Sequence, residues 1–297
     1  MECKMFKGSI TALLTPFKNG IVDEETFQSF VEWQVSEGTD ALVPCGTTGE
    51  SPTLDHNEHM RVIELCIEAA GGKVPIIAGA GSNATHESIA LASHAQKVGA
   101  NAILIVTPYY NKPSQEGMFQ HFKAIHDSVN LPIIIYNIPG RSVVDMSIET
   151  VANLAQLHNI VGIKDASADL TRPMLTRLAV RNNDFCQLSG EDATAVPFLA
   201  GGGDGCISVT ANIVPKLCHE MHEAWRHRNL DTAMAIQDRL MPLHKALFCE
   251  TSPGPVKYAA QLIGRANSEV RLPLWEISDK SKKQVEAALN SLGLLQE

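Results

Sequence analysis

The 297-residue sequence lacks paired cysteines, long apolar runs and an excess of basic residues. Its seven cysteines are odd in number and form no C-x-x-C pair, which argues against a disulfide framework or a zinc site and indicates reduced thiols. The N-terminal segment shows no apolar stretch typical of a secretion signal, and the apolar runs are far too short to span a membrane. We therefore expect a cytoplasmic protein.

Basic residues are scarcer than acidic ones, with 24 lysines and arginines against 33 aspartates and glutamates and a formal net charge of −9. An acidic surface repels phosphate backbones, so we expect no nucleic-acid partner, although a local positive pocket could still hold a small anion. Hydrophobic residues make up 44% of the chain, which provides ample material for a buried core.

Short β-branched runs alternate about eight times with longer amphipathic segments. The runs are apolar throughout, as expected for parallel strands buried on both faces. This repeat predicts an α/β protein with a (β/α)8 TIM barrel. A doubly wound open sheet is the alternative, and the lack of a switch-point glycine motif ranks it lower. The expected strands are Ile10–Thr15, Ala41–Cys45, Pro75–Ala80, Ala102–Thr107, Pro132–Asn137, Val161–Asp165, Cys186–Ser189 and Cys206–Thr210.

Helical patterns fill the intervals and continue beyond the eighth strand. We predict a catalytic barrel over residues 1–228 and a C-terminal helical extension over residues 229–297. The glycine-rich run at 201–205 precedes the eighth strand, at the bottom of a barrel, and therefore reads as a helix end and turn rather than a phosphate loop. The expected helices are Glu24–Glu37, Asn57–Ala70, His86–Val98, Gln115–Ser128, Ser147–Leu157, Pro215–Arg226, Leu230–Phe248, Pro255–Ile263 and Asp279–Leu292.

Lys164 is the most informative candidate, because functional groups in this fold gather where strands end. Desolvation in its apolar strand would favour the neutral amine, which can attack a carbonyl. The alternative is a lysine that reaches solvent or pairs with Asp165. Tyr136 ends the neighbouring strand and could move protons beside an imine, although a buried tyrosine is more often an ordinary core residue.

Other polar residues are expected at the same ends of the strands. Thr47 and Thr48, flanked by glycines, offer hydroxyls and backbone amides to a small carboxylate, or belong to an ordinary loop before a helix. Tyr109 and Tyr110 form a proline-bracketed loop, and Arg141 follows another strand end. We see no set of histidines and carboxylates there that would hold a catalytic metal, so neither a metal nor another cofactor is expected.

Five of these motifs together resemble the superfamily of N-acetylneuraminate lyase and dihydrodipicolinate synthase, the class I pyruvate aldolases. The similarity runs in order and at matching spacing from Phe6 to about Leu272. Arg141 and Tyr110 make the dihydrodipicolinate synthase family the nearer match. The motifs are Gly46-Thr47-Thr48-Gly49-Glu50, Tyr109-Tyr110-Asn111-Lys112-Pro113, Tyr136-Asn137-Ile138-Pro139, Gly162-Ile163-Lys164-Asp165 and Ser189-Gly190-Glu191-Asp192.

The resemblance implies condensation of pyruvate with L-aspartate 4-semialdehyde, in lysine and diaminopimelate biosynthesis, through a Schiff base on Lys164. It implies a homotetramer built as a dimer of dimers, in which Tyr110 reaches into the partner's site. By the same resemblance Tyr136, Thr47 and Tyr110 relay protons, and Arg141 binds the carboxylate of the semialdehyde. The residues that it assigns to substrate binding are Thr48, Arg141, Gly190 and Ile207.

Some members of the family are inhibited by L-lysine in a cleft between two subunits. The resemblance implies that this chain can bind the effector, because a suitable side chain stands at each matching position. The alternative is that these polar residues are simply solvated, or that the two histidines are stray metal ligands. The matching residues are Ser51, His56, His59, Asn83, Glu87 and Tyr109.

Three other functions remain open at this point. The chain could be another pyruvate-dependent lyase, acting on N-acetylneuraminate or a 2-keto-3-deoxy sugar acid. A sugar-phosphate isomerase would require a glycine-rich anion site after the seventh and eighth strands, which is absent from the sequence. A non-catalytic binding barrel is the third possibility, and the presence of Lys164, Tyr136 and Thr47 argues against it.

Overall fold

The computed structural model describes residues 6–182 and 184–295. Its contacts divide the chain into two compact units. The first unit comprises Met1–Gly8 and Pro75–Ile207, and the second unit comprises Ser9–Val74 and Ser208–Glu297. Lys164, Tyr136 and Arg141 therefore belong to the first unit, whereas Thr47 and Thr48 belong to the second.

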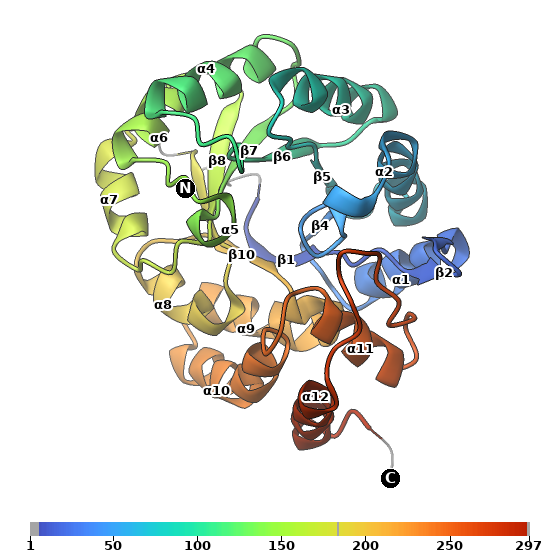
Figure 1. Ribbon diagram of the computed structural model, residues 1–297. Coiled ribbons are helices and arrows are strands. Elements are labelled where there is room, and N and C mark those ends of the chain that lie inside the picture. The colour runs from blue at the N-terminus through green and yellow to red at the C-terminus, as the bar shows by residue number, and fades with distance from the viewer. Residues whose placement is uncertain (1–5, 183, 296–297) are drawn as a thin grey trace. The chain divides into compact units, whose positions relative to one another are not determined.

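Eight strands belong to one sheet, and helices stand between them in the chain (Figure 1). In the first unit the strand order is β10-β9-β8-β7-β6-β5, with parallel neighbours, and in the second unit β1 lies parallel to β4. These features confirm the predicted (β/α)8 barrel. The strands are β1 (Gly8–Ala12), β4 (Ala41–Val43), β5 (Ile77–Gly79), β6 (Ala102–Val106), β7 (Ile133–Asn137), β8 (Ile160–Asp165), β9 (Cys186–Ser189) and β10 (Gly205–Ser208).

The helices begin and end close to the predicted positions. Helix α2 shows why: the Asp55 side chain caps the Glu58 amide, the Glu58 side chain returns to Asp55, and Gly71 ends the helix with a left-handed φ of 56°. The helices are α1 (Glu24–Ser36), α2 (His56–Ala70), α3 (Thr85–Val98), α4 (Gln115–His126), α5 (Pro139–Ser142), α6 (Ile148–Leu154), α7 (Arg172–Ala179), α8 (Ala195–Ala200), α9 (Pro215–Arg226), α10 (Leu230–Ala246), α11 (Gly254–Leu262) and α12 (Asp279–Ser291).

Several predicted strands end earlier in the structure, and the largest difference is at β1, which ends at Ala12 instead of Thr15. Strand β4 ends at Val43, because Cys45 adopts a left-handed φ of 56° that no regular strand can continue. Strand β10 ends at Ser208, and Thr210 opens the 3₁₀ helix η3 (Thr210–Asn212) instead. The sequence analysis also missed the helices α5, α7 and α8 and the antiparallel pair β2 (Phe17–Lys18) and β3 (Ile21–Val22), which are all short.

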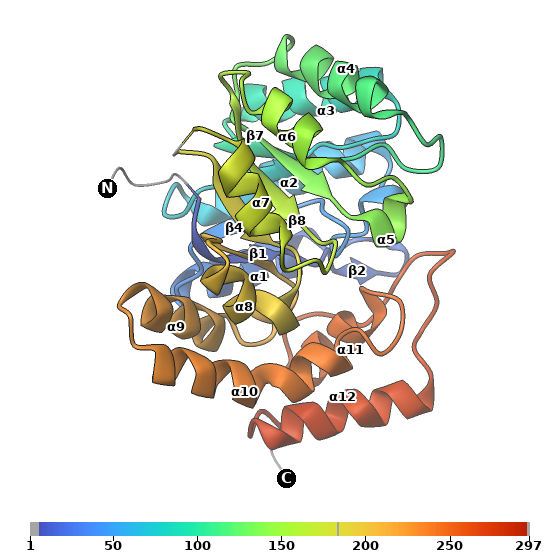
Figure 2. The same ribbon diagram turned by 90° about the vertical axis from the view of Figure 1, so that its left-hand side faces the viewer.

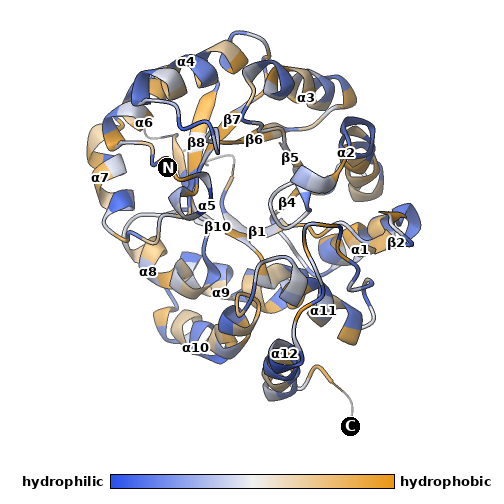
Figure 3. Cartoon of the chain, viewed as in Figure 1, coloured by the Kyte–Doolittle hydropathy of each residue, from blue (hydrophilic) through white to orange (hydrophobic). Residues whose placement is uncertain are grey.

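The core of the first unit consists of its central strands. Four of the five residues of β6 and all five of β7 are buried, and these strands are hydrophobic along most of their length (Figure 3). Outside them, α3, α4 and α6 alternate between polar and apolar faces (Figure 3). Burial of a charged side chain in such strands costs free energy unless a specific interaction or function compensates for it. The buried Lys164 on β8 is therefore a notable exception to the apolar pattern.

The C-terminal helices pack mainly on one another within the second unit. Helix α10 contacts α9 and α12, and α11 contacts α12 (Figure 2). The predicted C-terminal helices are thus confirmed, while the proposed boundary between a barrel at 1–228 and an extension at 229–297 stays a prediction. Within the described parts of the chain, no helix has both the length and the apolar character needed to cross a membrane.

The cysteines are reduced thiols wherever the structure describes them. Five are buried, and Cys249 is partly exposed, whereas Cys3 lies outside the described residues. Burial raises the pKa of the Cys45 and Cys66 thiols well above the usual value. These two side chains are therefore inert as nucleophiles near neutral pH.

Candidate active site

Lys164 and Tyr136 lie side by side at corresponding positions of neighbouring strands. Tyr136 on β7 pairs in register with Lys164 on β8, and side chains at paired positions leave the same face of a sheet. The Nζ atom of Lys164 is 4.2 Å from the centre of the Tyr136 ring. Only 6% of Lys164 and 5% of Tyr136 is exposed. A phenol so close to a buried amine can move protons to and from a reacting lysine.

Asp165 follows Lys164 on β8 but contacts different neighbours. Consecutive side chains of a strand leave opposite faces. The Asp165 carboxylate accepts a 2.8 Å hydrogen bond from Nε of Arg172 on α7 and a 2.5 Å hydrogen bond from the Ser167 hydroxyl. Arg172 is itself buried and donates to the Met146 carbonyl at 2.7 Å. The alternative in which Lys164 serves only as the ion-pair partner of Asp165 is therefore disfavoured.

Gly190 and Ile207 lie at or just beyond the ends of the next two strands. The Gly190 amide donates to the Asp165 carbonyl at 2.7 Å. A Cβ atom at Gly190 would lie 2.5 Å from the Cβ of Ala166, so only glycine allows this approach of the two strand ends. Ile207 on β10 is fully buried. Gly190 thus lies against the end of β8, whereas Ile207 lies in the buried part of β10, two strands away.

The loop with the paired tyrosines is held by an asparagine from the segment before α3. The Asn83 side chain donates to the Tyr109 carbonyl at 3.1 Å, and the Asn111 side chain donates to the Asn83 carbonyl at 2.8 Å. Tyr110, between them, has a left-handed φ of 73° and is 89% exposed. Within this chain, Tyr110 therefore projects outward rather than into a buried relay.

Arg141 lies in the one-turn helix α5, in a loop that Asn137 closes. The Asn137 side chain donates to the Asp145 carboxylate at 2.8 Å and accepts from the Met146 amide at 3.0 Å. The Ser142 hydroxyl fixes the same turn by donating to the Ile138 carbonyl at 2.9 Å. Arg141 is an exposed residue of this turn, just after the end of β7.

Thr47 and Thr48 lie in the second unit, in the tight loop after β4. The Glu50 amide donates to the Thr47 carbonyl at 3.1 Å. Thr48 is only 3% exposed. A Cβ at Gly49 would approach the Leu13 carbonyl oxygen to 3.0 Å, which leaves little room for another residue. The loop therefore presents its hydroxyls and amides in one fixed conformation.

The predicted effector residues are divided between the two units. In the second unit, Ser51 opens the 3₁₀ helix η1 (Ser51–Thr53), while His56, the first residue of α2, is exposed and His59 is 3% exposed. In the first unit, the Glu87 carboxylate accepts a 2.5 Å hydrogen bond from the Ser82 hydroxyl. The Asn83 side chain donates a hydrogen bond to the Tyr109 carbonyl.

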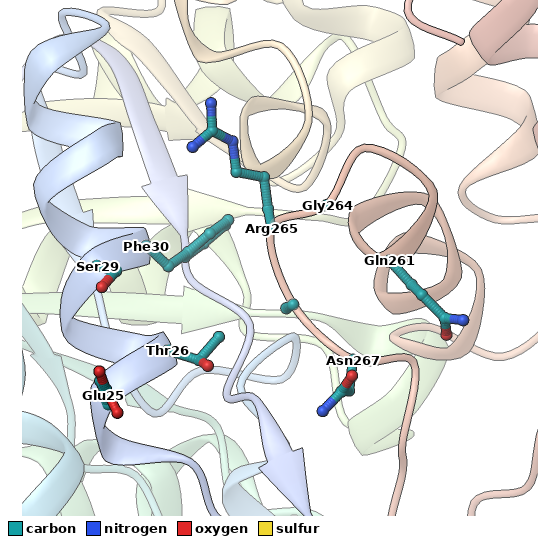
Figure 4. A pocket seen from close by; sticks show the side chains of 9 residues that line it. Glu25, Thr26, Ser29, Phe30, Gln261, Gly264, Arg265 and Asn267 are labelled. Carbon is teal, nitrogen blue, oxygen red and sulfur yellow. The ribbon is translucent and has the colours of Figure 1, made fainter. Parts of the chain in front are cut away.

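A shallow pocket in the second unit contains none of the predicted site residues (Figure 4). It has a volume of about 560 Å³ and lies between α1 and the segment after α11. Most of its lining is polar and exposed, and nothing in it resembles the Lys164 site chemically. Its lining residues are Glu25, Thr26, Ser29, Phe30, Gln261, Gly264, Arg265, Ala266 and Asn267.

One group with metal-ligating side chains occurs in the described residues, also in the second unit. Donor atoms of Asp40, His219 and Glu223 lie within 4.8 Å of one another. The Asp40 Oδ2 atom already accepts from the Ser9 amide at 2.8 Å and pairs with His219 Nδ1 at 3.2 Å, while Glu223 pairs with Arg226. These contacts account for the group without an ion. The sequence analysis did not single it out, although the i,i+4 spacing of His219 and Glu223 is visible.

The sequence analysis also missed two buried cations, Arg172 on α7, which pairs with Asp165, and Lys257 on α11. In the sequence both look like ordinary helix-surface residues. The amphipathic pattern could have placed Lys257 on the apolar face of its helix, between Val256 and Ala259. Its partner, Glu50, lies 207 residues away and could be found only in the folded chain.

Eight parallel strands, the helices between them and the C-terminal helices place the chain among the (β/α)8-barrel enzymes. It belongs to the dihydrodipicolinate synthetase family, whose model matches residues 5–292. The 4-hydroxy-tetrahydrodipicolinate synthase of Rhodospirillum centenum is 61% identical over 291 residues, covering 98% of this chain and 100% of the relative.

Solved structures of the family share the whole fold. The chloride-inhibited dihydrodipicolinate synthase from Acinetobacter baumannii, complexed with pyruvate, has a TM-score of 0.94 and 43% identity and covers 97% of this chain and 99% of its own. The enzyme from Cyanidioschyzon merolae with lysine bound has a TM-score of 0.95 and 39% identity, over 99% of this chain and 100% of its own. The barrel with C-terminal helices is therefore the fold of a known enzyme family.

Proposed function

We propose that the chain is a 4-hydroxy-tetrahydrodipicolinate synthase, which condenses pyruvate with L-aspartate 4-semialdehyde in lysine and diaminopimelate biosynthesis. The observation that carries the proposal is the buried Lys164 beside Tyr136, with Nζ 4.2 Å from the ring centre. The relative from R. centenum, 61% identical along its full length, supports the same activity.

In the proposed reaction, the Lys164 amine attacks the ketone carbon of pyruvate and forms a carbinolamine. The carbinolamine loses water to give an imine, and removal of a methyl proton gives an enamine. The enamine carbon attacks the aldehyde carbon of the second substrate, whose oxygen takes up a proton. The substrate amine then adds to the imine carbon and displaces Lys164, which closes the ring. The protonated imine serves as the electron sink, so the proposed reaction uses no metal or organic cofactor.

Tyr136 is the proposed proton donor and acceptor for these steps, because its ring centre lies 4.2 Å from the Lys164 Nζ atom. We assign Thr47 and Tyr110 to the same proton relay. Thr48, Gly190 and the backbone of Ile207 would hold pyruvate. Gly190 lies just after β9, where the close approach to Ala166 leaves no room for a larger residue.

Arg141 is the proposed binding residue for the carboxylate of the semialdehyde. Arg141 is an exposed residue on a loop that Asn137 and Ser142 hold in place. A guanidinium donates two parallel hydrogen bonds to a carboxylate, which selects a substrate with that group over one without it.

A homotetramer is the proposed assembly, built as a dimer of dimers. Tyr110 is 89% exposed in the single chain, which suits a residue that completes the site of a partner subunit. The segment at α7 carries a second sign of assembly, a cluster of exposed apolar side chains. Its members are Leu170, Met174, Leu175 and Leu178, of which Leu178 is 79% exposed.

Inhibition by L-lysine is part of the proposal, as is a cytoplasmic location. The relative from C. merolae carries bound lysine. Asn83 and Tyr109, two of the six matching residues, are joined by a hydrogen bond next to Tyr110.

A net charge of −9 supports a protein that does not bind nucleic acid, and none of the described helices suits a membrane.

Product analysis tests the proposed function directly. The purified chain, incubated with pyruvate and L-aspartate 4-semialdehyde, should form 4-hydroxy-tetrahydrodipicolinate, as followed by mass spectrometry. Neither substrate alone should give this product. The proposal is wrong if the chain makes no product from this pair but releases pyruvate from N-acetylneuraminate or from a 2-keto-3-deoxy sugar acid.

A further inference from the structure

An ion pair between Glu50 and Lys257 is completely buried in the second unit. Neither side chain is exposed to solvent. Lys257 projects from α11, whereas Glu50 belongs to the loop that carries Thr47 and Thr48. The Lys257 ammonium also donates to the Glu269 carbonyl at 2.8 Å and lies 4.0 Å from the centre of the Phe17 ring. The pair thus ties the C-terminal helices to the loop after β4.

A buried ion pair carries a large desolvation penalty compared with an apolar core. Two charges lose their hydration when they are buried, and apolar residues of similar volume often stabilise a fold as well or better. Burial lowers the pKa of Lys257 to about 8, although the Glu50 carboxylate opposes this shift. A gain in stability alone therefore does not account for the pair. We consider instead how the pair fixes the conformation of the loop that carries Thr47 and Thr48.

The geometry of the loop is strained on both sides of the two threonines. Cys45 has a φ of 56° and Glu50 a φ of 55°, in the left-handed region that costs a non-glycine residue free energy. Such conformations persist only where surrounding contacts hold them. At Glu50 those contacts are the Lys257 ammonium on one carboxylate oxygen and, on the other, the Arg271 amide at 3.1 Å.

Arg271 fixes the same region from its other side. Its guanidinium donates to the Thr53 carbonyl at 2.9 Å and to both carboxylate oxygens of Glu58 at 2.6 Å. The segment after α11 is therefore hydrogen-bonded to the loop at Glu50, at Thr53 and at the start of α2. A relaxation of Glu50 would move the backbone on which Thr47 and Thr48 stand.

We propose that Glu50 and Lys257 are positioning residues for pyruvate, which hold the Thr47–Thr48 loop in its binding conformation without touching the substrate. The inference rests on the proposed function and assigns a role to the C-terminal helices. Displacements of about 1 Å in a positioning group can change a rate about a hundredfold. The pair should therefore affect pyruvate binding and imine formation more than recognition of the second substrate.

The test uses the full chain and three variants. Glu50→Gln and Lys257→Met each remove one charge with little change of shape, and the double variant removes both charges. The single variants should lower the melting temperature, because each leaves a buried charge without its partner. The double variant should recover much of that loss. Its KM for pyruvate should nevertheless remain raised by about tenfold or more, with a smaller change in the KM for the semialdehyde.

A double variant that regains its melting temperature but keeps a raised KM for pyruvate would show that the pair positions the loop. A purely stabilising pair would not affect the KM once stability is regained. Lys282→Met is the matched control, because Lys282 pairs with Glu276 at 3.3 Å on the surface of the same unit. This control should leave both KM values unchanged. If the neutral variants do not fold, Glu50→Asp keeps both charges and shortens the reach, and should still raise the KM for pyruvate.

Two results would overturn the inference while leaving the proposed function intact. The first is a wild-type level of pyruvate use in the folded double variant or in Glu50→Asp. The second is an equal rise of both KM values, which would indicate general loosening of the chain. An inactive wild type would instead contradict the proposed function itself.

Discussion

Lys164 is the register partner of Tyr136 across β7 and β8, and its Nζ atom lies 4.2 Å from the centre of the phenol ring. The two strands that hold these residues are buried, so the sheet fixes the relative positions of the two backbones and burial restricts both side chains. Because Asp165 contacts Arg172 and Ser167, Lys164 is not required as its counterion. The amine is thus available for chemistry.

Trapping with borohydride should label Lys164. In the presence of pyruvate, borohydride should inactivate the enzyme and leave a reduced pyruvyl group on the peptide that contains this residue. Lys164→Arg should abolish labelling, because a guanidinium does not form the imine. Peptide mass mapping makes the measurement. An adduct on Lys257 or Lys112, or no adduct at all, would show that the nucleophile is misassigned.

Arg141→Ala should impair the use of the semialdehyde far more than the use of pyruvate. Loss of a charged hydrogen-bond donor from a carboxylate site corresponds to a rise of about tenfold to a hundredfold in the KM for that substrate. Borohydride trapping with pyruvate should proceed normally. Arg181→Ala, at an exposed arginine before β9, is the control. If Arg141→Ala loses imine formation but keeps its affinity for the semialdehyde, Arg141 serves pyruvate instead.

His121 on α4 should make the protein less stable in mild acid. Its side chain is 6% exposed, with Nδ1 3.0 Å from the Thr85 hydroxyl, and burial lowers its pKa to about 4. As the pH falls from about 6.5 to about 4, the unfolded chain binds this proton and the folded chain does not, so the free energy of unfolding decreases. The decrease from this group is on the order of 2 kcal/mol at pH 5.

Denaturant unfolding at pH 7.5 and pH 5 checks the His121 effect. His121→Leu should lose more stability relative to wild type at pH 7.5 than at pH 5, because only wild type carries the acid penalty. His86→Gln, at an exposed histidine on α3, should show the same difference from wild type at both pH values. An equal effect of His121→Leu at both pH values would contradict the assignment.

The order of strands and helices could be predicted because each buried strand is an apolar run and each helix has its own period. Lys164 and Tyr136 could be matched because they end successive strands. Lys257 and Glu50 could not, since 207 residues separate them and a helical lysine is usually solvated. The exposure of Tyr110 fits the resemblance, which implies that this residue reaches into a partner's site, but its left-handed backbone conformation leaves no local pattern in the sequence.

Inhibition by L-lysine is expected to depend on Glu87. Its carboxylate accepts a 2.5 Å hydrogen bond from Ser82, so it is held in place and can receive an effector ammonium group. Next to Ser82, Asn83 donates to the Tyr109 carbonyl at 3.1 Å, which gives a physical connection between this segment and the Tyr110 loop. Adjacency of this kind permits coupling, and measurement of both sites has to establish it.

Activity measured against rising L-lysine, for wild type and for Glu87→Gln, makes that test. The glutamine keeps an oxygen for the Ser82 hydroxyl but removes the charge, so the fold of the segment should survive. Because a charge-assisted hydrogen bond to the effector is lost, the lysine concentration for half inhibition should rise about tenfold or more, with unchanged activity in its absence. His86→Ala, at the exposed neighbour on α3, should behave as wild type. Wild type that is unaffected by millimolar lysine, or Glu87→Gln that is inhibited equally well, would show that these residues form no effector site.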